Sequence, residues 1–262
     1  MRKSVLIPLA LLIISLVLTS CASTVEPSEA YQNQNAEQIF NEGEENLRDK
    51  NYSETIKHFE ALEIQYPLAP HIERAQLHII YAYYMKEEYP LAISAADRFM
   101  RLHPASPHVP YALYIQGLSN YYQNLGILER TFKIDLAKRD LTSLQKAFGD
   151  FSDLVARYPS SPYTPSAHQY MVYLRNLFAD HELQVADYYY RRQAYVAAAN
   201  RAADVVRYYE GASAVPEALV IMVKSYRKLK STEQADDTLA VLQHNYPDST
   251  YVRDATAKES GG

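Results

Sequence analysis

The sequence contains no tryptophan and a single cysteine, and only seven of its 262 residues are glycine. One cysteine excludes a disulfide within the molecule and leaves no second thiolate for a zinc site. The eight histidines form no His-Glu-x-x-His helix motif, and the chain has no Gly-x-Ser-x-Gly elbow, phosphate-cradling loop or dinucleotide fingerprint. A net charge of −5 gives no general case for binding nucleic acid. The sequence therefore predicts a protein with no enzymatic activity, no metal and no cofactor.

Tyrosine is abundant, with 24 copies, and good helix formers are plentiful. The segment Arg74–Pro104 shows the helical pattern best. Its first half, Leu77–Tyr84, is apolar almost all round, as in a helix with neighbours on several sides. Its second half carries an apolar stripe of period 3.6 over Leu91–Leu102, with Pro90 and Pro104 at its ends. This segment is predicted to be a helical hairpin, which needs similar neighbours to cover its apolar faces.

The hairpin pattern recurs along the chain. Prolines that end second helices fall at positions 67, 104, 159 and 247, and a spacing of about 34 residues plus a connector is that of the tetratricopeptide repeat. Five pairs are predicted: 36–48 with 52–66, the pair within 74–104, 111–124 with 141–158, a long helix from 165 through 190 with 195–209, and 216–229 with 231–246. The predicted fold is an all-α, tetratricopeptide-type superhelical solenoid of about five helix pairs. An irregular α-domain with similar pairs is the alternative.

The N-terminus is organised differently. A basic start is followed by an apolar segment over 5–18 and by small residues before Cys21, which is typical of a secretory signal peptide. The stretch also resembles the bacterial lipobox, which implies that Cys21 carries diacylglycerol and an N-acyl chain such as palmitate. By the same resemblance, Ala22 in place of aspartate implies sorting to the outer membrane, facing the periplasm. Loss of residues 1–20, with two basic and no acidic side chains, changes the net charge to −7. An ordinary signal sequence with a chance cysteine is the alternative.

These patterns divide the chain into consecutive segments. They are a cleaved signal peptide (1–20), a lipidated cysteine with a flexible tether (21–35), N-terminal repeats (36–110), a third repeat (111–164) with an inserted loop (125–140), C-terminal repeats (165–249) and a disordered tail (250–262). As a flexible coil, the tether has a root-mean-square reach of about 20 Å.

The concave face of such a solenoid is lined by the first helix of each pair. Because Gly43, Gly117 and Ala186 are predicted to be buried contacts, helical spacing assigns the groove-facing positions. They are Phe40, Leu47, Leu77, Tyr81, Tyr84, Tyr111, Tyr114, Leu118 and Tyr121. A tyrosine-rich groove suits an extended or helical peptide, since each ring adds apolar area and a directed hydrogen bond at little entropic cost. For any single tyrosine, packing between repeats is an equally open interpretation.

Several pieces of the chain resemble the BamD family of the β-barrel assembly machine in Gram-negative outer membranes. They are Ile80-Tyr81-Ala82-Tyr83-Tyr84, Asp97–Leu102, Phe132 with Asp135, Arg139-Asp140, Ala147–Pro159, Val185-Ala186 with Tyr188-Tyr189, Ala194–Ala197 and Asn200-Arg201. The family's glycine before Ala-Tyr is Gln193 here, and the fourth pair ends in Glu210-Gly211 without proline. These departures put the shape of the fourth turn in doubt more than the resemblance.

The resemblance implies a scaffold on the periplasmic face of the outer membrane that helps barrel proteins assemble and insert. Its N-terminal repeats would receive the targeting segments of unfolded outer-membrane β-barrel proteins and an extended segment of an accessory lipoprotein, such as BamC or BamE. Its C-terminal repeats would dock on the periplasmic domain of BamA through Tyr195, Asn200 and Arg201, with Arg201 forming an ion pair.

Two other functions are weighed against this one. A different repeat lipoprotein, such as a secretin pilot or a coordinator of cell-wall synthesis, is disfavoured by the loop residues at 132–140. A hydrolase within the insert would need a nucleophile–base pair, and the sequence shows none.

Overall fold

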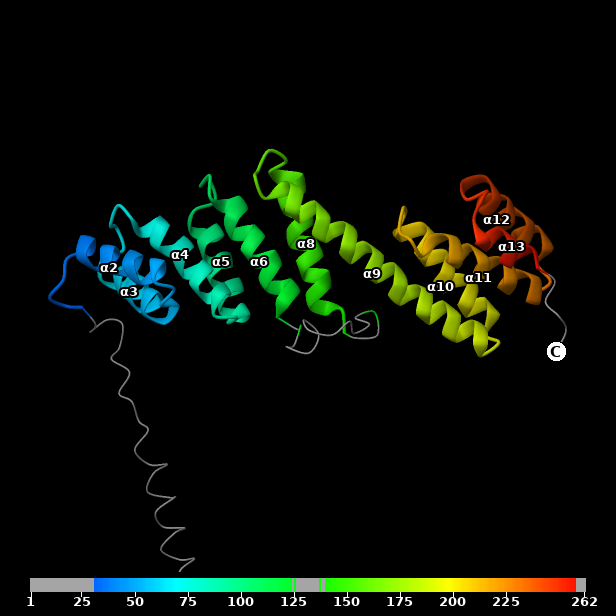
Figure 1. Cartoon of the computed structure of the whole chain (residues 1–262), viewed down its shortest axis with the longest axis horizontal. Helices are drawn as coiled ribbons and strands as arrows, with labels where there is room; N and C mark the ends of the chain where they lie inside the picture. The colour runs from blue at the N-terminus through cyan, green and yellow to red at the C-terminus, as the bar shows by residue number, and fades with distance from the viewer. Residues whose placement is uncertain (1–30, 124, 126–136, 138–139, 258–262) are drawn as a thin grey trace, which may run out of the picture. The chain divides into compact units, whose positions relative to one another are not determined.

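The structure, a computed structural model, describes residues 31–123, 125, 137 and 140–257. These residues fold into helices without a strand, and they form two compact units, one ending at Ala82 and one beginning at Tyr83 (Figure 1). The predicted signal peptide, Cys21 and most of the inserted loop lie outside the described residues. The all-α prediction is confirmed.

The first unit contains the hairpin of α2 (Ala36–Arg48) and α3 (Tyr52–Gln65), followed by α4 (Ile72–Met85), in which the boundary between the units falls. A capping box starts α2, because the Asn35 side chain accepts from the Gln38 amide at 3.0 Å while Gln38 Oε1 accepts from the Asn35 amide at 2.9 Å. Inside the hairpin, the Phe59 ring lies against Gly43, where an added Cβ would stand 2.5 Å from the ring. Gly43 is therefore the close contact that the sequence predicted.

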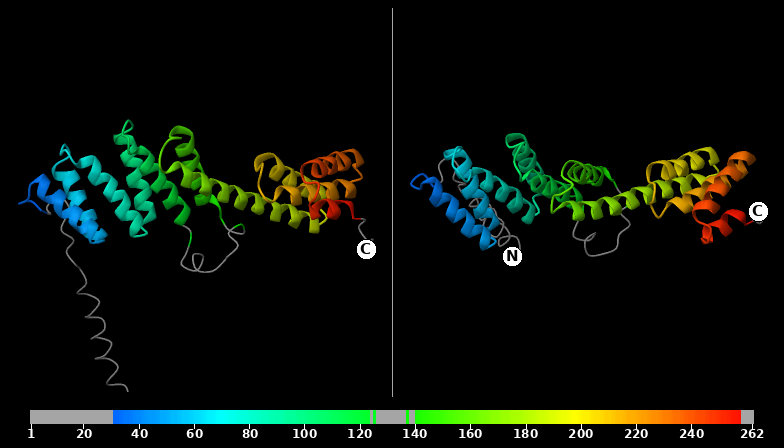
Figure 2. Two further views of the ribbon diagram at one scale, coloured as in Figure 1. Left: turned by 45° about the horizontal axis from the view of Figure 1, so that its top comes forward. Right: turned by 90° about the horizontal axis from the view of Figure 1, so that it is seen from above.

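The second unit is a series of helices, each packed against the next along the chain. They are α5 (Tyr89–Leu102), α6 (Val109–Tyr122), α8 (Thr142–Arg157), α9 (Thr164–Arg191), α10 (Tyr195–Tyr208), α11 (Val215–Lys228), α12 (Thr232–Asn245) and α13 (Thr250–Thr256). The 28-residue α9 contacts α8, α10 and α11, and both further views show it running from α8 to α10 (Figure 2). Serial packing of helix pairs is the tetratricopeptide arrangement.

The interior of the second unit repeats the glycine–phenylalanine contact. Phe151 is fully buried on α8, and an added Cβ at Gly117 of α6 would lie 2.6 Å from its ring. Towards the C-terminal end, small residues such as Ala186, Ala198 and Ala202 let the helix axes approach closely. The buried positions predicted at Gly117 and Ala186 are confirmed.

The turns inside four hairpins share one backbone conformation. Lys50, Glu87, Gln193 and Lys230 each adopt a φ of about +60°, the left-handed region that ends many helices. Gln193, where the BamD family has glycine, therefore keeps the conformation that glycine would adopt without strain. Gln193 is therefore one of four residues other than glycine that adopt this conformation in a hairpin turn.

Two segments differ from the prediction of flexible ends. The stretch before α2, expected to be tether up to residue 35, is held on the first hairpin: Tyr31 stacks on His58 at 4.2 Å, Gln34 donates to Glu42 at 2.9 Å, and Tyr66 donates to the Gln34 carbonyl at 2.8 Å. The expected tail also begins with α13. There Ala255 is fully buried and Tyr251 and Val252 pack on the C-terminal core, because helical spacing gives this short segment one apolar face.

Candidate functional site

The residues predicted for the groove in the first unit divide into buried and half-buried side chains. Phe40 is 4% exposed and Leu77 8% exposed, so neither presents its side chain to a peptide. The Phe40 ring lies 5.6 Å from Phe59 and stacks on His71 at 4.6 Å. The groove prediction is wrong for Phe40 because it lies one helical turn before Gly43, on the face that packs against α3.

Leu47 and Tyr81 remain partly accessible. Tyr81 meets the Tyr52 ring edge-on, with centroids 6.1 Å apart. Burial raises the pKa of the Tyr81 hydroxyl, and Tyr52 adds to the shift, so this phenol stays protonated and can donate a hydrogen bond at neutral pH. These two residues are the part of the first unit's predicted groove that a peptide can reach.

A charged cluster that the sequence analysis missed lies beside them. Glu44 on α2 pairs with Arg74 at 2.6 Å, and its other oxygen lies 2.8 Å from His78 Nδ1. That second approach is not aligned as a hydrogen bond, and burial lowers the pKa of His78 despite the neighbouring carboxylate. The Arg74 guanidinium also covers the Phe40 ring at 5.3 Å. The signal for this cluster in the sequence was weak, because its members come from two helices.

The tyrosines predicted for the second unit form one continuous aromatic network. Tyr84 approaches Tyr122 at 6.4 Å, and the network continues through Tyr121 to Tyr170 at 5.1 Å. The contacts that connect the remaining rings involve Tyr89, Tyr111, Tyr114, Phe151, Tyr163 and Tyr173. Tyr84, Tyr111, Tyr114 and Tyr121 are all half-buried. The structure thus brings these predicted residues together, mainly as packing between helices.

Hydrogen bonds fix the rings of this network. The Tyr114 hydroxyl bonds to Ser166 Oγ at 2.8 Å, and the Tyr122 and Tyr170 hydroxyls lie 3.3 Å apart. Burial raises the pKa of Tyr121 and of Tyr170 well above the ordinary value for a phenol. Leu118, also predicted for the groove, is 7% exposed and belongs to the core. Val172 and Tyr173 of α9, which the prediction omitted, are 38% and 45% exposed and give the network an accessible edge.

The predicted docking residues lie on α10. Arg201 Nη1 lies 3.1 Å from Glu182 Oε2 of α9, and their side chains are 46% and 21% exposed. Asn200 is exposed, whereas Tyr195 is half-buried with its ring 5.5 Å from Tyr190. The structure therefore presents Asn200 and Arg201 to the outside and gives Arg201 a carboxylate partner within the chain.

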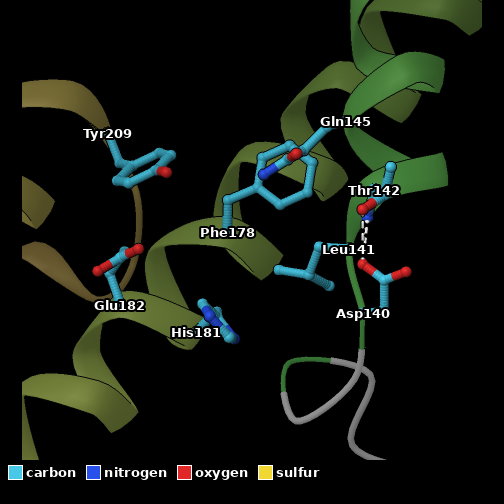
Figure 3. Close-up of a pocket in the computed structure, with 8 residues that line it drawn as sticks. All are labelled: Asp140, Leu141, Thr142, Gln145, Phe178, His181, Glu182 and Tyr209. Atoms are coloured by element: carbon cyan, nitrogen blue, oxygen red, sulfur yellow. Dashed lines mark hydrogen bonds between the residues drawn. The ribbon is translucent and has the colours of Figure 1, made fainter.

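A cavity of about 250 Å³ adjoins this ion pair (Figure 3). It is lined by Asp140, Leu141, Thr142 and Gln145 at the start of α8, by Phe178, His181 and Glu182 of α9, and by Tyr209 after α10. Burial raises the pKa of Tyr209, and the Glu182 charge adds to the shift. His181 bonds to the carbonyl of the buried residue Ala137, and this contact holds Ala137 against α9.

Two hydrogen bonds engage the Thr142 hydroxyl and the His181 imidazole in this cavity. The Thr142 hydroxyl donates to Asp140 at 2.6 Å, while His181 Nδ1 is engaged by a backbone carbonyl. No hydroxyl–imidazole pair is therefore formed by the residues lining the cavity. Within the described ranges, no group of three His, Cys, Asp or Glu side chains is arranged to hold a metal ion.

Comparison with known proteins gives consistent results. The family described as outer membrane lipoprotein, YfiO, matches residues 32–240. The chain is 35% identical over 254 residues to the outer membrane protein assembly factor BamD of Neisseria meningitidis serogroup B, covering 96% of this chain and 94% of that protein. It is 32% identical to BamD of Haemophilus influenzae over 93% of this chain and 92% of that one. For Vibrio cholerae BamD the identity is 34%, over 79% and 86%. Of the helices formed by the described residues, none is both long enough and apolar enough to cross a membrane.

Proposed function

Because this chain belongs to the YfiO/BamD family of outer membrane lipoproteins, we propose that it is an assembly factor for β-barrel proteins of the outer membrane. The observation that carries the proposal is the match over almost the whole chain to relatives that are named as such factors. Those names describe an assembly factor and no enzyme. The serial helix pairs support a role in binding other chains.

In this proposal, Cys21 is lipidated and holds the protein on the periplasmic face of the outer membrane. The anchor rests on the lipobox-like sequence ending at Cys21. Two or more acyl chains are needed for stable anchoring, since one chain alone binds a membrane only marginally.

The proposed partners are BamA and accessory lipoproteins such as BamC and BamE, with unfolded barrel proteins as clients. The exposed α10 residues Asn200 and Arg201 support a docking surface for the periplasmic domain of BamA, with Tyr195 at the start of the same helix. For client targeting segments, the partly accessible Leu47 and Tyr81 support a contact on the first unit. The accessible edges of Tyr84, Tyr111, Tyr114 and Tyr121 support a separate contact on the second unit.

The docking surface is tested by removing the charge of one residue. Arg201 pairs with Glu182 in the free chain, so binding of an acidic partner residue must compete with that pair. Arg201→Gln is expected to reduce co-purification of BamA about tenfold, the scale of a lost charge-assisted contact. The matched control, Glu182→Gln, frees the guanidinium and is expected to retain or increase co-purification, as measured by quantitative immunoblot of tagged protein from envelopes.

Equal recovery of BamA by the wild-type and Arg201→Gln proteins would place the docking contact elsewhere. Recovery of secretins or cell-wall enzymes without BamA would favour a different repeat lipoprotein.

A further inference from the structure

A second cavity lies at the opposite end of α8 from the one described above. It has a volume of about 390 Å³, within the range of ligand-binding pockets. The turn that precedes α6 forms one wall and the turn between α8 and α9 the other. The lining residues are Pro107, His108, Pro110, Tyr111, Arg157, Tyr158, Pro159, Ser160, Ser161, Pro162 and Tyr163.

The walls of this cavity, which we call the Tyr/Pro pocket, are held in place by internal contacts. Thr164 Oγ1 donates to the Tyr158 carbonyl at 2.7 Å, and the Tyr163 amide donates to Ser161 Oγ at 3.3 Å. The Tyr163 ring stacks on Tyr114 at 5.2 Å and lies 5.7 Å from Tyr111. A ligand therefore meets preformed aromatic and prolyl surfaces and does not have to order them, which lowers the entropic cost of binding.

The fixed charge within the Tyr/Pro pocket is positive, and the nearest carboxylate on the same helix, Asp153, lines a neighbouring cavity with Arg157. None of its lining residues is acidic, and its fixed charge is the exposed guanidinium of Arg157. This group lies over the Tyr158 ring at 5.3 Å and donates to the Tyr158 hydroxyl at 3.3 Å. It forms no ion pair within the described part of the chain, so it is available to an anionic ligand.

The shape of the pocket selects among peptide conformations. The described part of the second unit has no strand, and so offers no sheet edge to which a β-strand ligand can add. A helical ligand needs a long apolar groove, and this cavity is short. Tyrosine-lined clefts with proline walls suit the polyproline II conformation, which loses little entropy on binding.

We propose that the Tyr/Pro pocket binds an extended, proline-containing acidic segment of a partner protein. Prolyl rings of the ligand pack on Tyr111 and Tyr163, and a carboxylate of the ligand pairs with Arg157. The inference rests on the proposed role of this chain in binding other proteins, and it names the class of segment bound at one site.

The test uses the full chain and a fluorescein-labelled peptide of three Pro-Pro-Glu repeats, with binding measured by fluorescence anisotropy. Arg157→Glu is expected to weaken binding at least about tenfold. Arg207→Glu is the matched control, because Arg207 also lies in the last turn of a helix and covers the following tyrosine, Tyr208, at 5.8 Å but lies outside the pocket. This control changes the net charge equally and is expected to leave the affinity unchanged.

Two further peptides test the two halves of the proposal. Replacing each glutamate by lysine, or each proline by serine, is expected to weaken binding at least about tenfold. Absence of saturable binding, equal loss with Arg207→Glu, or equal affinity for the serine peptide would each overturn the inference. Co-purification of BamA is measured in parallel for the wild-type chain and the Arg157→Glu variant. If the peptide test fails but BamA still co-purifies with both proteins, only the pocket proposal is refuted. If BamA does not co-purify with the wild-type chain, the assembly role is refuted.

Discussion

Gly43 and Gly117, in the first helices of their hairpins, lie where a phenylalanine ring leaves no room for a side chain, whereas Gly149 does not. Gly117 faces the Phe151 ring, which is itself enclosed by Tyr114 and by Tyr170, stacked at 5.0 Å. Gly149 has nothing within 4 Å of the position its Cβ would occupy. Alanine substitutions at Gly117 and Gly149 therefore distinguish the effect of steric crowding from the entropic cost of a glycine within a helix.

Gly117→Ala is expected to lower the free energy of unfolding by about 1–3 kcal/mol, because the new methyl group overlaps a ring that cannot move aside. Gly149→Ala is expected to raise it by about 0.5–1 kcal/mol, since alanine loses less entropy than glycine in a helix interior. Urea unfolding followed by circular dichroism measures both. Stabilisation by both variants would show that the ring at Gly117 adapts.

Asp150 of α8 is an ionisable group in an unfavourable place. Burial raises its pKa to about 6, although Asn120 donates to it at 2.6 Å and Lys146 lies nearby. Asp97 and Asp153 add to the increase. Because the folded chain favours the protonated form, the contribution of Asp150 to stability is fully present below its unfolded pKa and is lost as the pH rises towards 6.

Asp150→Asn is expected to raise the free energy of unfolding by about 1–2 kcal/mol at pH 7.5, after allowance for the partial exposure of the group. At pH 4 the gain should disappear, because the wild-type carboxyl is then protonated in the folded chain. Thermal unfolding between these pH values measures the difference. Asp237→Asn, at an exposed position on α12, is the control, and an equal response there would assign the effect to net charge.

Individual side chains were the least predictable part of the site. Helical spacing alone placed Phe40 and Leu77 in the groove, yet both are buried, because the width of the covered face depends on neighbours that the spacing does not contain. Conversely, the chain-internal partner of Arg201 comes from α9, nineteen positions away. Pairing across helices is set by tertiary packing, so no local pattern predicts it.

At the scale of helices, the sequence predicted much more. The predicted ranges 52–66 and 141–158 correspond to α3 (Tyr52–Gln65) and α8 (Thr142–Arg157), because Pro67, Pro159 and the apolar periodicity mark helix ends and faces directly. The two misses, the ordered segment at 31–34 and α13, are short. Each is stabilised by contacts with another element, which a short local pattern does not reveal.

The C-terminal helix α13 covers part of α11. Its buried residue, Ala255, accepts a hydrogen bond from Arg227, and Tyr251 and Val252 pack on the same core. A chain ending after Ser249 is expected to lose about 1–3 kcal/mol of unfolding free energy, mainly from newly exposed apolar surface on α11. Urea midpoints measure the loss. A chain ending after Ala257 keeps the helix and should match the full chain; equal midpoints for both truncations would show that α13 contributes nothing.

For the whole molecule, we expect the location in the cell to depend on Cys21, the proposed site of lipidation. Cys21→Ser is expected to abolish palmitate labelling and to move the protein from the membrane fraction to the periplasmic fraction, because the proposed lipids provide the anchor. Far-UV circular dichroism of the purified variant should match that of the wild type. Retention in the membrane fraction without label, in a chain from which residues 1–20 have been removed, would mean that protein contacts hold the chain there.

The contacts made by Tyr31, Gln34 and Tyr66 limit the distance between the folded part of the chain and a lipid anchor at Cys21. Because the chain is held on the first hairpin from Tyr31 onwards, only the segment between Cys21 and Tyr31 can act as a tether. This segment has ten Cα–Cα virtual bonds, so its length when fully extended is at most about 35 Å. A force applied along this tether therefore acts first on the α2–α3 hairpin. The first repeat would therefore be the first part of the fold to bear the mechanical load of tethering.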